Sequence, residues 1–146
     1  MKKIPGKIVL VDDQEYERTL LEEVLLEKEW NTTIEYFPRA EEALRYLKET
    51  DDKIFLIISD INMPGMNGLE FKKIIDQHDE LSRKAIPFIF VSTAATQDEV
   101  TEAYGYRVQG YFQKPKSVEA QADMLDIIIQ YWIVNQHPQL SGISAT

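Results

Sequence analysis

Several charged and polar side chains directly follow short apolar runs of the sequence. Asp12 and Asp13 come after KIVLV, and Asp60 comes after IFLIIS. Ser92 ends the run PFIFVS, and Lys114 follows GYFQ. Carboxylates placed together repel one another unless a cation or a proton separates them. Oxygen ligands in this number suit Mg²⁺, which takes one or two carboxylates with a phosphoryl oxygen and keeps several waters. If these side chains converge, they indicate a magnesium site beside a phosphoryl group.

Each residue also has an ordinary structural interpretation. An Asp after a strand often caps the next helix, and this alternative stays open for Asp13. Lys114 alone is more often a solvated charge, and Ser92 alone is more often a loop hydroxyl. One such residue at the end of an apolar run is expected by chance. All of them in that position are much less expected by chance. The shared position favours a common site.

The apolar runs that precede these residues predict strands, because they are short and rich in β-branched and aromatic residues. The five runs are Lys7 to Val11, Thr33 to Phe37, Ile54 to Ser59, Pro87 to Ser92 and Gly110 to Gln113. Segments with helical spacing follow each of them. This alternation predicts an α/β fold, a five-stranded parallel sheet with five helices on both faces. We expect the flavodoxin-like, doubly wound form with strand order 2-1-3-4-5, whose ligands bind beyond the carboxyl ends of the strands.

Apolar spacing and start signals predict the helices. Helical spacing runs between Glu15 and Trp30, and it recurs at Ala40, Ala43, Leu44 and Leu47. Asn67 to Glu70 and Thr96 to Glu99 both resemble capping boxes, with an oxygen-bearing residue three before a Glu. The last predicted helix runs from Val118 to Val134.

Length and composition exclude several classes of protein. The 146 residues suit one domain, which we expect to span 1–138 with a short polar tail at 139–146. The net charge of −9 argues against nucleic acid as a direct partner. The absence of cysteine excludes disulfides and thiolate chemistry. Since we find neither a signal peptide nor a stretch that could span a bilayer, we expect no membrane partner and a cytoplasmic protein.

Four separated motifs together resemble the receiver domain of two-component response regulators. They are VDD at the first strand, SDINMPGMNG at the third, VST at the fourth and KP after the fifth. The resemblance covers about residues 7 to 134, and it is specific because all four motifs stand in the right order at strand ends. A weaker resemblance links the chain to cyanobacterial phytochrome response regulators.

The resemblance implies a phosphoryl acceptor and a metal site. Asp60 would accept the phosphoryl group of a phosphohistidine, on a sensor histidine kinase or a phosphotransfer protein. Asp13 would bind Mg²⁺ (or Mn²⁺) directly, Asp12 would bind it mostly through water, and Asn62 would bind it through the backbone carbonyl. The turn that follows Asp60, Met63-Pro64-Gly65-Met66, has the Pro and Gly positions of a type II turn.

The resemblance also implies how the phosphoryl group is held and sensed. Lys114 would pair with one phosphoryl oxygen and Ser92 would hydrogen-bond another, while Tyr111 would move inward on activation. It further implies a cis peptide bond before Pro115. Ser92 stands where the family most often has Thr, so we expect hydrogen bonding to survive and coupling to Tyr111 to loosen.

Other functions remain as alternatives. A phosphatase of the haloacid dehalogenase type also uses an Asp nucleophile, but it needs a second Asp two residues later, where this chain has Asn62. A phosphotransfer protein needs an exposed helical histidine; we expect His78 and His137 to be solvated residues at helix ends. A receiver that acts as a scaffold without phosphorylation is the third alternative. We expect no enzyme activity other than slow autophosphorylation from small donors and autodephosphorylation.

The output is expected at the protein surface, because we find no second domain for DNA binding or catalysis. The last predicted helix has more apolar residues than one core-facing stripe needs. We expect an exposed patch including some of Ile129, Trp132 and Ile133, and a homodimer through the fourth helix, fifth strand and fifth helix. The alternative is that the tail after Pro138 folds back over the patch. The downstream partner is not identified by the sequence.

Overall fold

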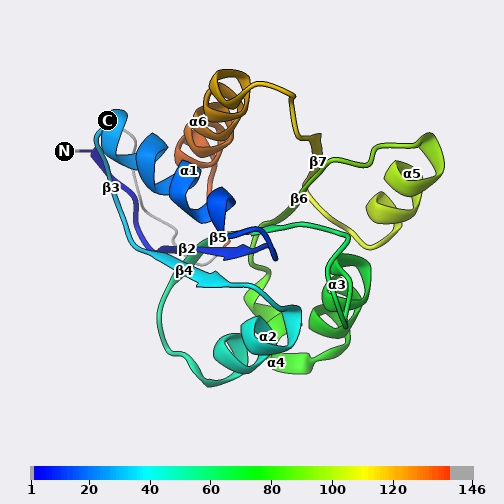
Figure 1. The fold of residues 1–146 in the computed structure, drawn as a ribbon. Coiled ribbons are helices and arrows are strands. Elements are labelled where there is room, and N and C mark those ends of the chain that lie inside the picture. The colour runs from blue at the N-terminus through cyan, green and yellow to red at the C-terminus, as the bar shows by residue number, and fades with distance from the viewer. Residues whose placement is uncertain (1, 139–146) are drawn as a thin grey trace.

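The computed structural model describes residues 2–138 and contains a five-stranded parallel sheet with helices on both faces (Figure 1). The strand order is β4-β2-β5-β6-β7. Their bounds are Lys7–Val11 for β2, Ile34–Phe37 for β4, Ile54–Ser59 for β5, Phe88–Ser92 for β6 and Gly110–Gln113 for β7. In chain order this is 2-1-3-4-5, so the predicted doubly wound topology is confirmed.

The strand β5 lies at the centre of the sheet and pairs with β2 and β6. All six of its residues are buried. Its sequence IFLIIS is apolar at consecutive positions because helices cover both of its faces, so neither face can be polar. This burial places the carboxyl end of β5, and the residue after it, in the middle of one sheet edge.

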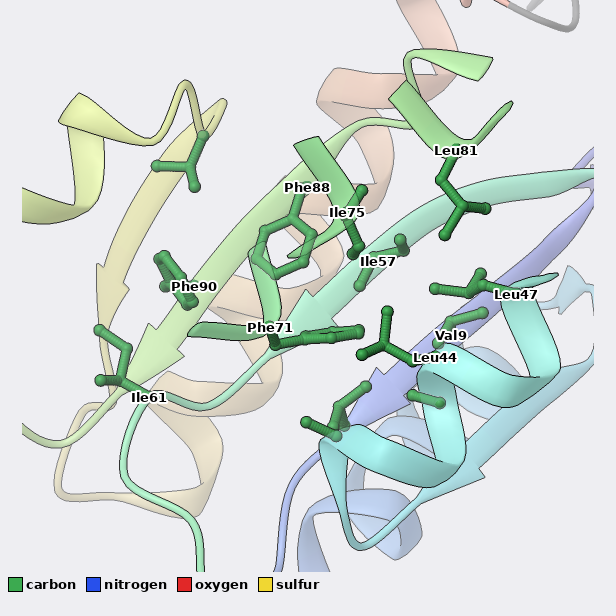
Figure 2. Close-up of a cluster of buried hydrophobic side chains, with 14 of the residues drawn as sticks. Val9, Leu44, Leu47, Ile57, Ile61, Phe71, Ile75, Leu81, Phe88 and Phe90 are labelled. Atoms are coloured by element: carbon green, nitrogen blue, oxygen red, sulfur yellow. The ribbon is translucent and has the colours of Figure 1, made fainter. Parts of the chain in front are cut away.

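The helices form two layers, one on each face of the sheet (Figure 1). On one face, α1 (Glu15–Glu27) and α6 (Val118–Val134) pack side by side over a cluster that includes Leu21 and Ile128. On the other, α2 (Ala40–Glu49), α3 (Gly68–Gln77), α4 (Asp79–Lys84) and α5 (Gln97–Gly105) supply a second cluster. Figure 2 shows that cluster, with Phe71 and Leu44 lying between helices and sheet.

The prediction of five helices is wrong, because the described residues form six. The short α4 is the additional helix. His78 ends α3 and also starts α4, where its Nδ1 accepts from the Leu81 N–H at 3.3 Å. Leu81 is buried and is the apolar residue that α4 adds to the core. A six-residue helix with one buried leucine is too short to produce a recognisable apolar period.

The first helix ends earlier than its apolar spacing indicated. Glu29 has a positive φ of 59°, which ends the helical conformation after Glu27. Trp30–Asn31 then forms β3, a strand that pairs with β1 (Lys2–Lys3) in a separate two-stranded sheet. Trp30 is also buried. The apolar spacing therefore continues into β3, which is why the sequence indicated a longer first helix.

Both predicted capping boxes begin helices. The Asn67 side chain accepts from the Glu70 N–H at 2.9 Å, while the Glu70 carboxylate accepts from the Asn67 N–H at 3.2 Å. Thr96 accepts from the Glu99 N–H at 3.2 Å. These caps satisfy backbone donors that a helix start leaves unpaired.

The helix α6 has the predicted bounds, but its exposed face is different from the one expected. Ile129, one of the three residues considered for the surface patch, is fully buried. Trp132 and Ile133 are only partly buried and pack against the core. In the second half of the helix the exposed apolar residues are Ile127 and, one and two turns later, Tyr131 and Val134. No helix within the described residues is long and apolar enough to cross a membrane.

His137 follows α6 and is buried, so the expectation that it is a solvated surface residue is wrong. Its Nε2 lies 2.8 Å from the Phe55 carbonyl oxygen, and its ring stacks on the Phe55 ring at 5.8 Å. Burial lowers the pKa of His137 below its ordinary value. This contact joins the end of α6 to the start of the central strand.

Candidate functional site

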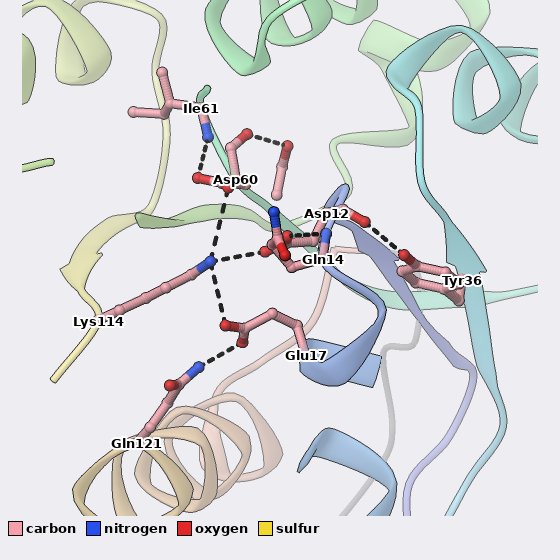
Figure 3. Close-up of polar contacts among 9 residues, drawn as sticks. Asp12, Gln14, Glu17, Tyr36, Asp60, Ile61, Lys114 and Gln121 are labelled. Carbon is pink, nitrogen blue, oxygen red and sulfur yellow. Dashed lines mark hydrogen bonds and ion pairs between the residues drawn. The ribbon is translucent and has the colours of Figure 1, made fainter. Parts of the chain in front are cut away.

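Three of the side chains predicted to form a site lie close together at the carboxyl edge of the sheet, those of Asp12, Asp60 and Lys114 (Figure 3). Asp12 follows β2, Asp60 follows β5 and Lys114 follows β7. Asp12, Asp13 and Asp60 each offer a carboxylate oxygen, and these oxygens lie within 4.8 Å of one another. Parallel strands bring their carboxyl ends to one edge, which is why residues far apart in sequence meet here.

The Lys114 ammonium lies among these carboxylates. Its Nζ is 2.9 Å from Asp12 Oδ2, 3.3 Å from Glu17 Oε1 and 3.7 Å from Asp60 Oδ2. Burial alone would lower the pKa of Lys114, but the carboxylates of Asp12, Asp60 and Glu17 outweigh it and raise the pKa above its ordinary value. The lysine is therefore a permanent cation that all three acids share.

Asp12 is the most confined of the three predicted acids, at 2% exposure. Its Oδ1 accepts from the Gln14 N–H at 2.9 Å, and its carbonyl oxygen accepts from the Tyr36 hydroxyl at 2.7 Å. Burial raises the pKa of Asp12 to about 6, against the opposing effects of Lys114 and the Gln14 N–H. The charged form of Asp12 is therefore disfavoured in the folded protein, and a bound divalent cation would favour it.

Asp60 is held rigidly by backbone groups. Its N–H donates to the Val11 carbonyl at 2.9 Å, and its Oδ1 accepts from the Ile61 N–H at 2.7 Å. The helix α3 begins directly against it, since a Cβ on Gly68 would lie 2.2 Å from the Asp60 carbonyl oxygen. Only glycine permits that approach. The remaining carboxylate oxygen, Oδ2, faces Lys114.

The loop after Asp60 has the features of the predicted turn. Gly65 has φ of 76°, the left-handed conformation that the third position of a type II turn requires. Met63 is buried, whereas Asn62 is exposed. The role of the Asn62 carbonyl as a metal ligand stays a prediction.

Ser92 and Tyr111 lie on the neighbouring strands β6 and β7. Ser92 is fully buried, and its Oγ has no hydrogen-bond partner among the described residues. The Tyr111 hydroxyl donates to the Ala94 carbonyl, and its ring lies 6.1 Å from that of Phe90. Burial raises the pKa of Tyr111. A buried hydroxyl without a partner is costly unless a ligand supplies one.

The expected cis bond before Pro115 is wrong, because residues 2–138 contain no cis peptide bond. The Lys114 N–H donates to the Ser92 carbonyl at 2.8 Å, so the backbone continues the sheet's hydrogen bonding up to the proline. The long lysine side chain alone reaches Asp12 Oδ2, and the backbone need not reverse.

Sequence reasoning missed Glu17, which lies on α1 and is 5% exposed. Its carboxylate contacts Lys114 and accepts a hydrogen bond from the Gln121 amide of α6. A signal was present in the sequence. Glu17 lies three, four and seven positions before Leu20, Leu21 and Val24, so an acid occupies the apolar face of its helix.

The three acids satisfy the chemical requirements of a divalent cation site. Clustered carboxylate oxygens, two of them on buried aspartates, are the hard ligands that Mg²⁺ takes. Lys114 supplies one positive charge to a cluster that, with Glu17, holds four acidic side chains. The donor set therefore fits a cation such as Mg²⁺.

The acidic cluster and the lysine lie beyond the carboxyl ends of the strands, where doubly wound α/β domains bind their ligands. A model of the response regulator receiver domain matches residues 8–126 of this chain. The chain therefore belongs to the response regulator receiver domain family, as its motifs predicted. Receiver domains are in general phosphoacceptors rather than enzymes, and they interact with histidine kinases and downstream targets.

Individual relatives agree with this assignment. Chemotaxis protein CheY-3 of Vibrio cholerae is 32% identical over 124 residues, covering 85% of this chain and 92% of CheY-3. Response regulator Rcp1 of Synechocystis sp. is 26% identical over 134 residues, covering 88% of this chain and 90% of Rcp1. The structure of the Mn²⁺-bound form of Rcp1 has a TM-score of 0.78 at 26% identity, covering 88% of this chain and 94% of that one. The phosphorylated cyanobacterial phytochrome response regulator RcpA also gives 0.78, at 25% identity and the same coverage.

Proposed function

We propose that this receiver domain accepts a phosphoryl group on Asp60 from a sensor histidine kinase or a phosphotransfer protein. The observation that carries the proposal is the position of the Asp60 carboxylate. Asp60 directly follows the central strand β5 and lies in the acidic cluster. One oxygen of its carboxylate accepts from the Ile61 N–H, and the other lies 3.7 Å from the Lys114 ammonium. The family of the chain supports the same conclusion.

The proposed reaction is a direct transfer. An Asp60 carboxylate oxygen attacks phosphorus, an O–P bond forms as the P–N bond to the donor histidine breaks, and the electron pair returns to the imidazole nitrogen. Lys114 approaches one phosphoryl oxygen, and the partnerless Ser92 hydroxyl donates to another. Catalysis of this kind depends on positioning and charge stabilisation, with little covalent machinery.

The proposed metal ligands are Asp13 directly, Asp12 mostly through water, Asp60 and the Asn62 carbonyl. Bound Mg²⁺ supplies positive charge that offsets the acids and the developing charge on the phosphoryl oxygens. Mn²⁺ has the same preference for oxygen ligands and is expected to substitute. The Mn²⁺-bound form of the related Rcp1 supports this assignment.

Labelling with a small donor tests the proposal. With acetyl phosphate and Mg²⁺, intact mass spectrometry should show one phosphate per chain, stable in acid and labile in base as an acyl phosphate is. A chain that takes no phosphate with Mg²⁺ present would favour the scaffold alternative. Rapid release of phosphate over many turnovers would favour the phosphatase alternative, which Asn62 in place of a second acid argues against.

Mg²⁺ is expected to stabilise the native state by about 1.4 kcal/mol at ten times its dissociation constant, from mass action. Asp13→Ala should remove most of this effect. Asp51→Ala is the matched control, since Asp51 is an exposed acid that precedes β5 at the opposite edge of the sheet. Thermal unfolding in chelator and in excess Mg²⁺ measures both. Equal responses of the two variants would count against a metal site at Asp13.

Signalling is proposed to leave through the surface of α5, β7 and α6, with a homodimer as its first partner. Ile127, Tyr131 and Val134 form an exposed apolar face on α6. Beside it is a groove of about 240 Å³ between β7 and α6, lined by Ile89, Gln109, Phe112, Ile127, Ile128, Tyr131 and Trp132. Exposed apolar surface of this kind marks partner sites. The alternative that the tail after Pro138 folds back over this apolar surface concerns residues outside those that the structure describes.

Ile127→Asp is expected to weaken the dimer at least about tenfold, because a charge would enter an apolar contact. Sedimentation with and without beryllofluoride, a phosphoryl mimic, measures this and shows whether affinity depends on the active conformer. Leu26→Asp on α1 is the control, since Leu26 is comparably exposed on a different helix. A wild-type monomer at high micromolar concentration in both states would refute the dimer.

A further inference from the structure

Glu17 is a buried acid that the proposed transfer reaction does not use. It lies on α1 at 5% exposure, and its Oε1 has no hydrogen-bond partner among the described residues. The cation facing that oxygen is the Lys114 ammonium, at 3.3 Å. The other oxygen, Oε2, accepts from the Gln121 amide on α6 (Figure 3). Glu17 therefore connects the phosphorylation site to α6.

The position of Lys114 shows what this connection does. Its Nζ is closer to Asp12 and Glu17 than to Asp60. A phosphoryl group on Asp60 would attract the same ammonium toward Asp60 and away from Glu17, which lies on the other side of it (Figure 3). When Lys114 moves toward Asp60, the Glu17 Oε1 loses its counter-charge. A buried carboxylate without a counter-charge is strongly unfavourable, so Glu17 must rearrange.

We propose that Glu17 is a positioning residue that restrains Lys114 away from Asp60 and transmits phosphorylation of Asp60 to α6 through Gln121. The inference rests on the proposed function and adds a regulatory role for α1 to it. It is separate from the Ser92 and Tyr111 pair, because Tyr111 packs against the cluster on the opposite face of the sheet from α1 and α6.

Phosphorylation kinetics test the contact with Lys114. Glu17→Gln keeps the shape of the side chain and its bond to Gln121 but loses the charge that restrains Lys114. We expect it to raise the rate of phosphorylation by acetyl phosphate about fivefold, because the Lys114 ammonium is then freer to approach the phosphoryl oxygens. Glu17→Asp keeps the charge but withdraws the carboxylate by one methylene, so it should also raise the rate. Glu23→Gln is the control, because Glu23 is exposed on the same helix.

Unchanged rates in both Glu17 variants would overturn the proposal. A higher rate in Glu17→Gln but not in Glu17→Asp would also overturn it. The lost negative charge, acting at a distance on the donor, would then explain the result without the contact between Glu17 and Lys114. Failure of the proposed function is distinguishable, because the wild-type chain would then take no phosphate at all. Melting temperatures of the variants confirm that each rate belongs to a folded protein.

Amide hydrogen exchange tests the contact with α6. Beryllofluoride with Mg²⁺ should increase exchange in the first two turns of α6 at least about threefold in the wild type, because Glu17 releases Gln121. Gln121→Met removes the hydrogen bond with little change in volume, and its α6 should exchange equally with and without beryllofluoride. The same increase in this variant, or no increase in the wild type, would contradict transmission through Gln121.

Discussion

Asp60→Asn is expected to abolish phosphate incorporation from acetyl phosphate and Mg²⁺, to below about one-hundredth of the wild-type rate. The substitution replaces the nucleophilic carboxylate with an amide, whose oxygen is a far weaker nucleophile. The fold should persist. The amide oxygen can still accept from the Ile61 N–H, and the Lys114 ammonium keeps its contacts with Asp12 and Glu17. Intact mass spectrometry over a time course measures the loss.

The comparison variant for this loss is Asp51→Asn, which removes the same charge at the opposite edge of the sheet and should label at the wild-type rate. Asp12 and Asp13 are the only other acids predicted at the site, so residual label should be mapped by proteolysis. Label on Asp12 or Asp13 at the original rate would refute Asp60 as the acceptor and identify the residue that replaces it.

The sheet and its acidic edge could be predicted because each depends on a local pattern. The continuous apolar run of β5 is possible only for a strand covered on both faces. Once the strands are known to be parallel, the residues after them must meet at one edge. The convergence of Asp12, Asp60 and Lys114 follows from strand ends alone, without any knowledge of side-chain geometry.

Contacts between distant segments could not be predicted in the same way. His137 is buried because the Phe55 carbonyl, 82 residues earlier, lies where the chain passes after α6. Nothing in the residues around His137 indicates that neighbour. Glu17 is an intermediate case, since an acid on the apolar face of a helix signals a buried partner without identifying it.

The face of α6 was misjudged for a different reason. Apolar residues occur all around this helix, so the stripe that faces the core has no polar border to identify it. Ile128 and Ile129 are buried while Ile127 is 63% exposed, although all three are isoleucine. The packing of α6 against α1 decides which of them lies inside.

Asp12→Asn is expected to stabilise the metal-free protein by about 3 kcal/mol above pH about 7, and by close to nothing below pH about 4. Folding raises the pKa of Asp12 from its ordinary value of 3.8 to about 6, because burial outweighs the favourable contacts with Lys114 and the Gln14 N–H. The folded state therefore binds the proton more tightly than the unfolded state. Between these two pKa values the stability of the wild-type protein declines as pH rises. Above pH about 6 the buried Asp12 side chain of the folded protein is charged, and that buried charge lowers the stability.

The amide that Asp12→Asn introduces resembles the protonated acid, so the variant avoids this cost at high pH and gains nothing at low pH. Other acids also titrate in this range, so the quantity to measure is the difference in unfolding free energy between variant and wild type, by urea titration in chelator. That difference should rise through the window from about 4 to 6. A difference that stays flat, or a variant less stable than the wild type at high pH, would show that the contact with Lys114 outweighs burial. Mg²⁺ should reverse the order, because a bound divalent cation favours the charged carboxylate and the variant lacks it.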